Sequence, residues 1–173
     1  AKLFTNLNIN YFSCIPPYNQ EGAKLAIESP ESKRSIAVMN EAFEARRDFV
    51  VDALNAMPGV SCQKPSGAFY VFPNIAGVVK DLQIDQAYAA LPADVRATTS
   101  PSTLFQMFLL WKYCVATMDR KSFGQIGTGN MHFLRLSIAT GMDDLKLGME
   151  RMDEAISDKQ GFARFIEAGE HFS

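Results

Sequence analysis

The chain has 173 residues, of which 47% are hydrophobic and 21% are charged, and its formal net charge is −2 at pH 7. This length and composition are typical of one globular domain with a sizeable core. The small negative charge gives no electrostatic reason to bind nucleic acid or an anionic membrane, and no apolar run approaches a transmembrane span.

Cysteine and histidine usage limits the chemistry further. The three cysteines, Cys14, Cys62 and Cys114, lie far apart, and no C-x-x-C pair occurs. This pattern predicts reduced, mostly buried thiols of an intracellular, cytoplasmic protein. The two histidines, His132 and His171, stand outside any cluster of ligands. We therefore predict neither a metal site nor a Ser-His-Asp triad.

The first part of the chain is predicted to lead into one long helix. Residues 1–19 are polar and aromatic and end near two prolines, which predicts an irregular segment before a short helix over roughly 20–28. Ser29 is a good N-cap, and Pro30 suits the first helical position. We expect this helix to run to about residue 57. Its apolar stripe recurs every seven residues, at Ile36, Phe43, Val50 and Met57.

The middle of the chain is predicted to form a hairpin and two helices. Residues 60–63 and 68–72 are strand candidates, and Lys64-Pro65-Ser66-Gly67 between them is a turn candidate. A short helix is expected around 85–90. A second helix, over 101–111, is apolar nearly all round, which is typical of a helix buried on most sides or lying against a missing partner.

The most informative segment is a strand candidate at 132–140. Apolar and polar positions alternate there, so Leu134, Leu136 and Ile138 fall on the core face and Arg135 falls on the other. A guanidinium offers a rigid fork of donors that matches a carboxylate, which makes Arg135 a candidate carboxylate receptor. The alternatives are a surface arginine or one arm of a structural ion pair.

The remaining elements complete the predicted fold. Residues 113–118 are expected to form a strand, followed by a loop over 119–130. An amphipathic helix is expected over 143–157, and a short helix in the tail 159–173. The predicted class is α+β, with a small, mostly antiparallel sheet of about four short strands flanked by helices.

Three blocks together resemble the C-terminal part of class I aminotransferases. They are Pro65–Pro73, Ser122–Gly124 and Phe133–Ala139, in this order and spacing. These relatives are fold type I enzymes that depend on pyridoxal phosphate (PLP). The resemblance covers most of residues 10–157.

The resemblance implies roles for residues and segments. Arg135 would bind the α-carboxylate of the amino-acid substrate, and Phe69 would be an aromatic wall of the substrate pocket. Residues 30–158 would be the small domain of such an enzyme. Residues 1–29 would join it to a missing large domain, and residues 159–173 would be a C-terminal tail. The partners implied are an amino acid, a 2-oxo acid and a second copy in a homodimer.

The cofactor's anchors are not expected in this chain. PLP chemistry requires a lysine that forms a Schiff base and an acid that keeps the pyridine nitrogen protonated. The resemblance places both of them before Ala1. We therefore expect no catalytic, cofactor-binding or metal-binding residue in this chain, no covalently bound PLP, and no activity of the chain alone. The parent enzyme would transfer an amino group between an amino acid and a 2-oxo acid.

Some alternatives stay open. A PLP-dependent β-lyase or decarboxylase would use the same carboxylate receptor, and a non-catalytic binding or scaffolding module could keep the same shape. Asp119-Arg120-Lys121 stands where many relatives have Pro-Gly, which leaves the substrate class open.

Overall fold

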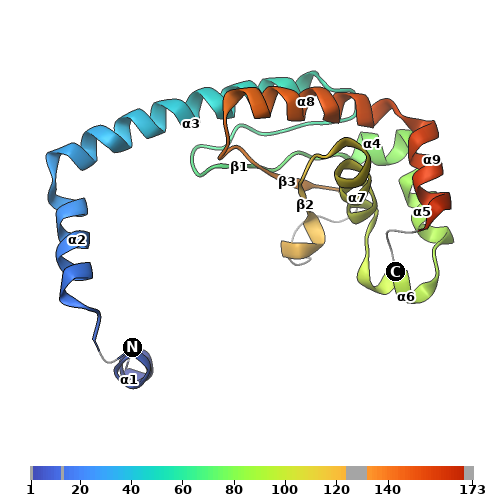
Figure 1. Cartoon of the computed structure of the whole chain (residues 1–173). Helices are drawn as coiled ribbons and strands as arrows, with labels where there is room; N and C mark the ends of the chain where they lie inside the picture. Colours follow the sequence, from blue (N-terminus) through green and yellow to red (C-terminus); the bar gives the residue numbers. More distant parts are fainter. Residues whose placement is uncertain (1, 13, 124–131, 170–173) are drawn as a thin grey trace. The chain divides into compact units, whose positions relative to one another are not determined.

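The fold is taken from a computed structural model that describes residues 2–12, 14–123 and 132–169 (Figure 1). The chain divides into two compact units, residues 1–42 and residues 43–173. The boundary between the two units falls within the long helix α3 (Pro30–Ala56).

The first unit is helical throughout most of its length. Helix α1 (Lys2–Phe12) precedes α2 (Pro17–Glu28). The irregular segment predicted for residues 1–19 was therefore wrong over most of its length. No proline or glycine interrupts α1, so nothing in the local backbone prevents a helix. The predicted start of α3 is confirmed, because the Ser29 hydroxyl accepts a hydrogen bond from the Glu31 N–H at 3.2 Å.

The second unit contains a three-stranded antiparallel sheet in the order β1-β3-β2. The strands are β1 (Tyr70–Val71), β2 (Met118–Asp119) and β3 (Leu134–Ser137). The predicted class, α+β with a small antiparallel sheet flanked by helices, is confirmed. The sheet has one strand fewer than the expected four among the residues described.

The predicted hairpin between residues 60–63 and 68–72 does not form. Ser61 makes only an isolated bridge, to Asn74, and β1 pairs with β3 instead. Pro65 has no N–H to donate, and Ala68 adopts a left-handed backbone with φ of 63°, so a regular ladder is interrupted between the two segments.

The predicted strand over 113–118 was also wrong over most of its length. Tyr113 ends helix α7 (Pro101–Tyr113), and Cys114 caps that helix in a left-handed conformation with φ of 54°. Only Met118 of the predicted strand enters β2. The loop expected next begins with a 3-10 helix, η1 (Arg120–Phe123), and its residues 124–131 lie outside the described part.

The other predicted helices of the second unit are confirmed. These are α5 (Ile84–Ala90), α7, α8 (Met142–Ser157) and α9 (Lys159–Ala168). Helices α4 (Ala76–Asp81) and α6 (Ala93–Thr98) were not predicted.

One hydrophobic core joins the sheet to the helices, and α7 runs through it. Helix α7 contacts α4, α5, α8 and β2. Its residues Leu104, Phe105, Phe108 and Leu109 are all 0% exposed, whereas Trp111 is exposed. The predicted burial of this helix on most sides is confirmed over residues 101–109, none of which is exposed, whereas residues 110–112 in its last turn are exposed. The cysteine prediction was wrong in part, because Cys62 is buried but Cys14 and Cys114 are exposed.

No helix among the described residues is long and apolar enough to cross a membrane.

Two adjacent leucines of α7 test this core. Leu109 is fully buried and Leu110 is 41% exposed. We expect Leu109→Ala to lower the free energy of unfolding by about 2–5 kcal/mol, because it leaves a cavity. The control Leu110→Ala makes the same chemical change on the same helix and should cost no more than about 1 kcal/mol. Urea unfolding followed by circular dichroism measures both, and equal losses would contradict this packing.

Candidate functional site

The site residue predicted from the alternation lies on the face of the sheet that turns away from the core. In β3, Leu134 and Leu136 are buried, whereas Arg135 is half-buried and Ser137 is exposed. The predicted orientation of Arg135 is therefore confirmed. Because side chains alternate strictly along a strand, the buried leucines hold the arginine on the opposite face.

Aromatic rings from two other segments surround the Arg135 guanidinium. Its central carbon lies 4.2 Å from the centroid of the Tyr70 ring and 4.7 Å from that of Phe123. One terminal nitrogen lies 2.6 Å from the sulfur of Met118, the residue directly opposite on β2. Such cation–π contacts contribute roughly 0.5–2 kcal/mol each and fix the plane of the guanidinium.

The guanidinium has no carboxylate beside it in the part of the chain that the structure describes. The ion pairs found there join other residues, and none includes Arg135. The alternative interpretation as one arm of a structural ion pair thus has no support among these residues.

More rings extend the apolar wall around this arginine. Phe72 and Phe133 stack with centroids 5.1 Å apart and planes 11° apart, and Phe123 meets Phe72 edge-on at 6.2 Å. A cavity of about 650 Å³ opens beside this wall. It is lined by Tyr70, Phe72 and Phe133 together with Asn55, Ser61–Pro65 and Asn74; Arg135 does not line it.

Phe69, the second predicted site residue, lies next to this wall. Its ring centroid is 4.4 Å from that of Tyr70 and 6.2 Å from that of Phe43. Both Phe69 and Arg135 therefore contact Tyr70. Phe69 is 42% exposed, which is too open for an ordinary core phenylalanine.

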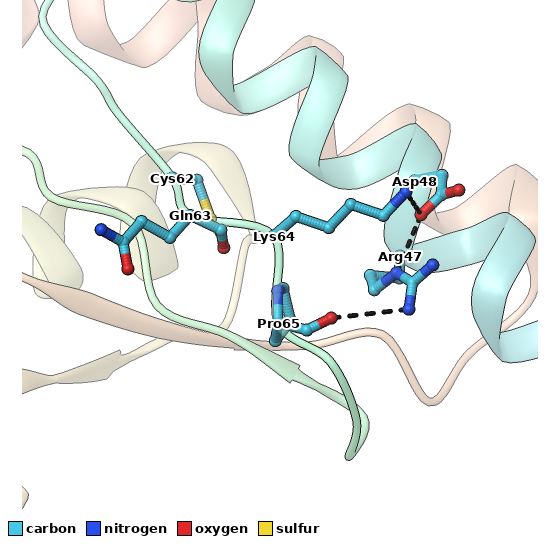
Figure 2. Close-up of polar contacts among 6 residues, drawn as sticks. All are labelled: Arg47, Asp48, Cys62, Gln63, Lys64 and Pro65. Carbon is cyan, nitrogen blue, oxygen red and sulfur yellow. Dashed lines mark hydrogen bonds and ion pairs between the residues drawn. The ribbon is translucent and has the colours of Figure 1, made fainter.

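A polar cluster holds the segment that leads to Phe69. Figure 2 shows Asp48 of α3 between Arg47 and Lys64, at 2.8 and 2.7 Å, and Arg47 reaching the Pro65 carbonyl at 3.5 Å. The hydrogen bond from Arg47, and then the one from Lys64, hold the pKa of the Asp48 carboxyl below its usual range. This cluster was not predicted, because Lys64 lies far from Asp48 along the chain.

A buried carboxylate, Asp119, anchors the segment on the other side of Arg135. Asp119 is 5% exposed and accepts hydrogen bonds from the hydroxyls of Thr103 and Ser122, each at 2.7 Å, and of Ser100 at 3.3 Å. Burial is the largest single influence and raises the pKa of the Asp119 carboxyl, but these hydrogen bonds together outweigh it. The pKa therefore lies below the usual aspartate range.

The described residues were also searched for groups of side chains that could bind a metal ion. The described residues contain no group of three or more His, Cys, Asp or Glu side chains that could hold a metal ion.

Comparison with known proteins places the chain in a family. The family model for aminotransferase class I and II matches residues 7–152, and the chain belongs to this family. A probable aspartate/prephenate aminotransferase from Aquifex aeolicus is 35% identical over 159 residues, which are 91% of this chain and 34% of the relative. An aspartate aminotransferase from Pyrococcus horikoshii is 30% identical over 92% of this chain and 35% of the relative.

Solved structures agree with the sequence relatives. The aspartate aminotransferase of Rhizobium meliloti matches with a TM-score of 0.69 and 28% identity, over 90% of this chain and 34% of that structure. The aromatic aminotransferase of Pyrococcus horikoshii matches with a TM-score of 0.69 and 25% identity, over 90% of this chain and 35% of that structure. This chain thus spans about a third of the length of these proteins.

The lowered pKa of Asp119 predicts a pH dependence of stability. An unfolded aspartate has a pKa of about 3.9, so the buried carboxylate stabilises the fold above that pH. This contribution should be lost as the pH falls from about 4 through the lower pKa of the folded state. Urea unfolding at a series of pH values should show a shallower loss for Asp119→Asn than for the wild type. Asp153→Asn, at an exposed carboxylate of α8, controls for removing one negative charge.

Proposed function

We propose that this chain supplies the α-carboxylate receptor of a PLP-dependent aminotransferase, as its small domain. The reaction would move an amino group between an amino acid and a 2-oxo acid. The observation that carries the proposal is the Arg135 guanidinium, held on a strand between two aromatic rings with no carboxylate beside it among the described residues. Membership of the aminotransferase family supports the reaction class.

Arg135 would bind the substrate through its planar fork. Two parallel N–H groups match the two oxygens of a carboxylate, which fixes both the position and the plane of the substrate's acid group. The Tyr70 and Phe123 rings keep the guanidinium from rotating, and the strand holds its backbone. A substrate gripped at this end presents its α-carbon in one orientation, and this lowers the entropic part of the barrier.

We expect no covalent attachment of PLP to this chain. When bound, PLP supplies the electron sink that amino-group transfer needs. Its lysine requires a site that excludes water, but all nine lysines of this chain are exposed. Lys64 and Lys112 are engaged with aspartates. We propose that the rest of the intact aminotransferase provides the anchoring lysine, which agrees with the third of the relatives' length that this chain spans.

Other features of the enzyme are proposed on family membership alone. Amino acid and 2-oxo acid substrates, a homodimer and a cytoplasmic location are expected. The domain boundaries at residues 29/30 and 158/159 also stay predictions.

The carboxylate receptor is tested by replacing Arg135 in the intact aminotransferase. Arg135→Ala should lower kcat/KM for amino acids by about 100- to 1,000-fold, because a charged bidentate contact is lost. Arg135→Lys should recover only part of this loss, because an ammonium cannot form the fork. Steady-state kinetics with several amino acids measures the effect.

Two controls make this result specific. Arg164→Ala, at an exposed arginine of α9, should leave kcat/KM unchanged. An amine that lacks the α-carboxylate should react equally slowly with the wild type and with Arg135→Ala, because it offers the receptor nothing to bind. Unchanged kcat/KM for amino acids in Arg135→Ala would exclude Arg135 from the substrate site.

Phe69 is proposed to line the substrate pocket. Because Phe69 is 42% exposed in this chain, Phe69→Ala should change the free energy of unfolding by no more than about 1 kcal/mol. The same substitution should lower kcat/KM of the intact aminotransferase by about tenfold through lost apolar contact with the substrate. Parallel kinetics and urea unfolding measure the two effects. A large stability loss with unchanged kcat/KM would make Phe69 a packing residue.

A further inference from the structure

The carboxylate of Asp119 gathers hydroxyls from two elements that flank its own strand. Ser100 and Thr103 come from the start of α7, and Ser122 comes from η1. The N–H of Ser122 also points at this carboxylate, at 3.3 Å, and the N–H of Asp119 itself donates to Gln106 of α7 at 2.9 Å. The short strand β2 and the turn after it are therefore tied to a helix that lies in the core.

Two residues that contact the Arg135 guanidinium are chain neighbours of this hydrogen-bonded cluster around Asp119. Met118 immediately precedes Asp119, and Phe123 immediately follows Ser122. Met118 reaches a terminal nitrogen of Arg135, and the Phe123 ring lies 4.7 Å from its central carbon. The third contact, Tyr70, comes from β1, which joins the opposite edge of β3. The cluster around Asp119 thus fixes Met118 and Phe123, which contact the guanidinium on the β2 side, whereas Tyr70 contacts it from the β1 side.

A second tether acts on the same turn from outside. The ammonium of Lys121 donates to the carbonyls of Ala97 and Thr99, at 2.9 Å each. It lies on the surface, whereas Asp119 is buried, so the buried carboxylate is the more exacting constraint on the turn.

We propose that Asp119 is a positioning residue for carboxylate binding. By fixing Met118 and Phe123, it gives the Arg135 guanidinium one orientation before the substrate arrives. The proposal rests on the proposed function of Arg135. A purely structural Asp119 would stabilise the fold equally but would have no coupling to the substrate's acid group.

The experiment measures this coupling in the intact aminotransferase. Asp119→Asn should raise KM for the amino acid by about tenfold, the scale of one hydrogen bond to a charged group, and change kcat by less than about twofold. In the Arg135→Ala background, the same substitution should lower kcat/KM no further, because the group through which it acts is gone. The control Asp144→Asn removes an exposed carboxylate of α8 that accepts a hydrogen bond from the Thr140 hydroxyl, and it should change neither KM nor kcat.

A second pair of variants keeps the test decisive if Asp119→Asn does not fold. Thr103→Val removes one hydroxyl that reaches the carboxylate and should raise KM, whereas Thr103→Ser keeps the hydroxyl and should restore KM to the wild-type value. Thermal melting of each variant separates loss of fold from loss of binding.

The outcomes distinguish the positioning role of Asp119 from carboxylate binding by Arg135. A lowered kcat/KM in Arg135→Ala together with an unchanged KM in Asp119→Asn and Thr103→Val would overturn the positioning role and leave the receptor in place. An equal loss of kcat/KM from Asp119→Asn in the wild-type and Arg135→Ala backgrounds would make the effect structural and overturn it too. An unchanged kcat/KM in Arg135→Ala would overturn both.

Discussion

The structure of the site depends on one side chain, the Arg135 guanidinium, held against the rings of Tyr70 and Phe123 on the outer face of a three-stranded sheet. That contact exists only in one register of β3. A slip by one residue would turn the guanidinium into the core and the leucines outward. Leu134 and Leu136 are buried, so the cost of losing their burial, about 1.5–3 kcal/mol for each side chain, protects the register.

The remaining elements add precision to this arrangement in two different ways. On the side of β2, the buried Asp119 joins a turn to α7 by accepting hydrogen bonds from hydroxyl groups of both. A buried carboxylate needs these hydrogen bonds, so the turn is held in one position. On the side of β1, the segment before Phe69 is held at the surface by Asp48, Arg47 and Lys64, where ion pairs contribute only about 0–1 kcal/mol. One flank of the site is thus rigidly anchored, and the other is weakly anchored.

Local patterns in the sequence were enough for some features and not for others. The outward orientation of Arg135 follows from strict alternation, and the start of α3 follows from the Ser29-Pro30 pair, since both signals act within a few residues. The hairpin prediction was wrong because Ala68 adopts a left-handed backbone, which cannot be predicted from an alanine in the sequence. The hydrogen bonds of Asp119 were not predicted because its partner Thr103 lies on another element, and only the fold brings the hydroxyl and the carboxylate together.

The exposure of the aromatic rings near Arg135 affects how strongly this arginine can bind a carboxylate. Phe69, Phe72 and Phe123 are all exposed in this chain, so a carboxylate docked on Arg135 here would stay partly in water. A solvent-exposed pair between a guanidinium and a carboxylate gains little, whereas the same pair shielded from water gains several times more. If Arg135 is the carboxylate receptor that we propose, its full strength would therefore require the rings to be covered in the intact protein. The sheet would set the orientation of the bound acid group, and the shielding of the rings from water would set the affinity for it.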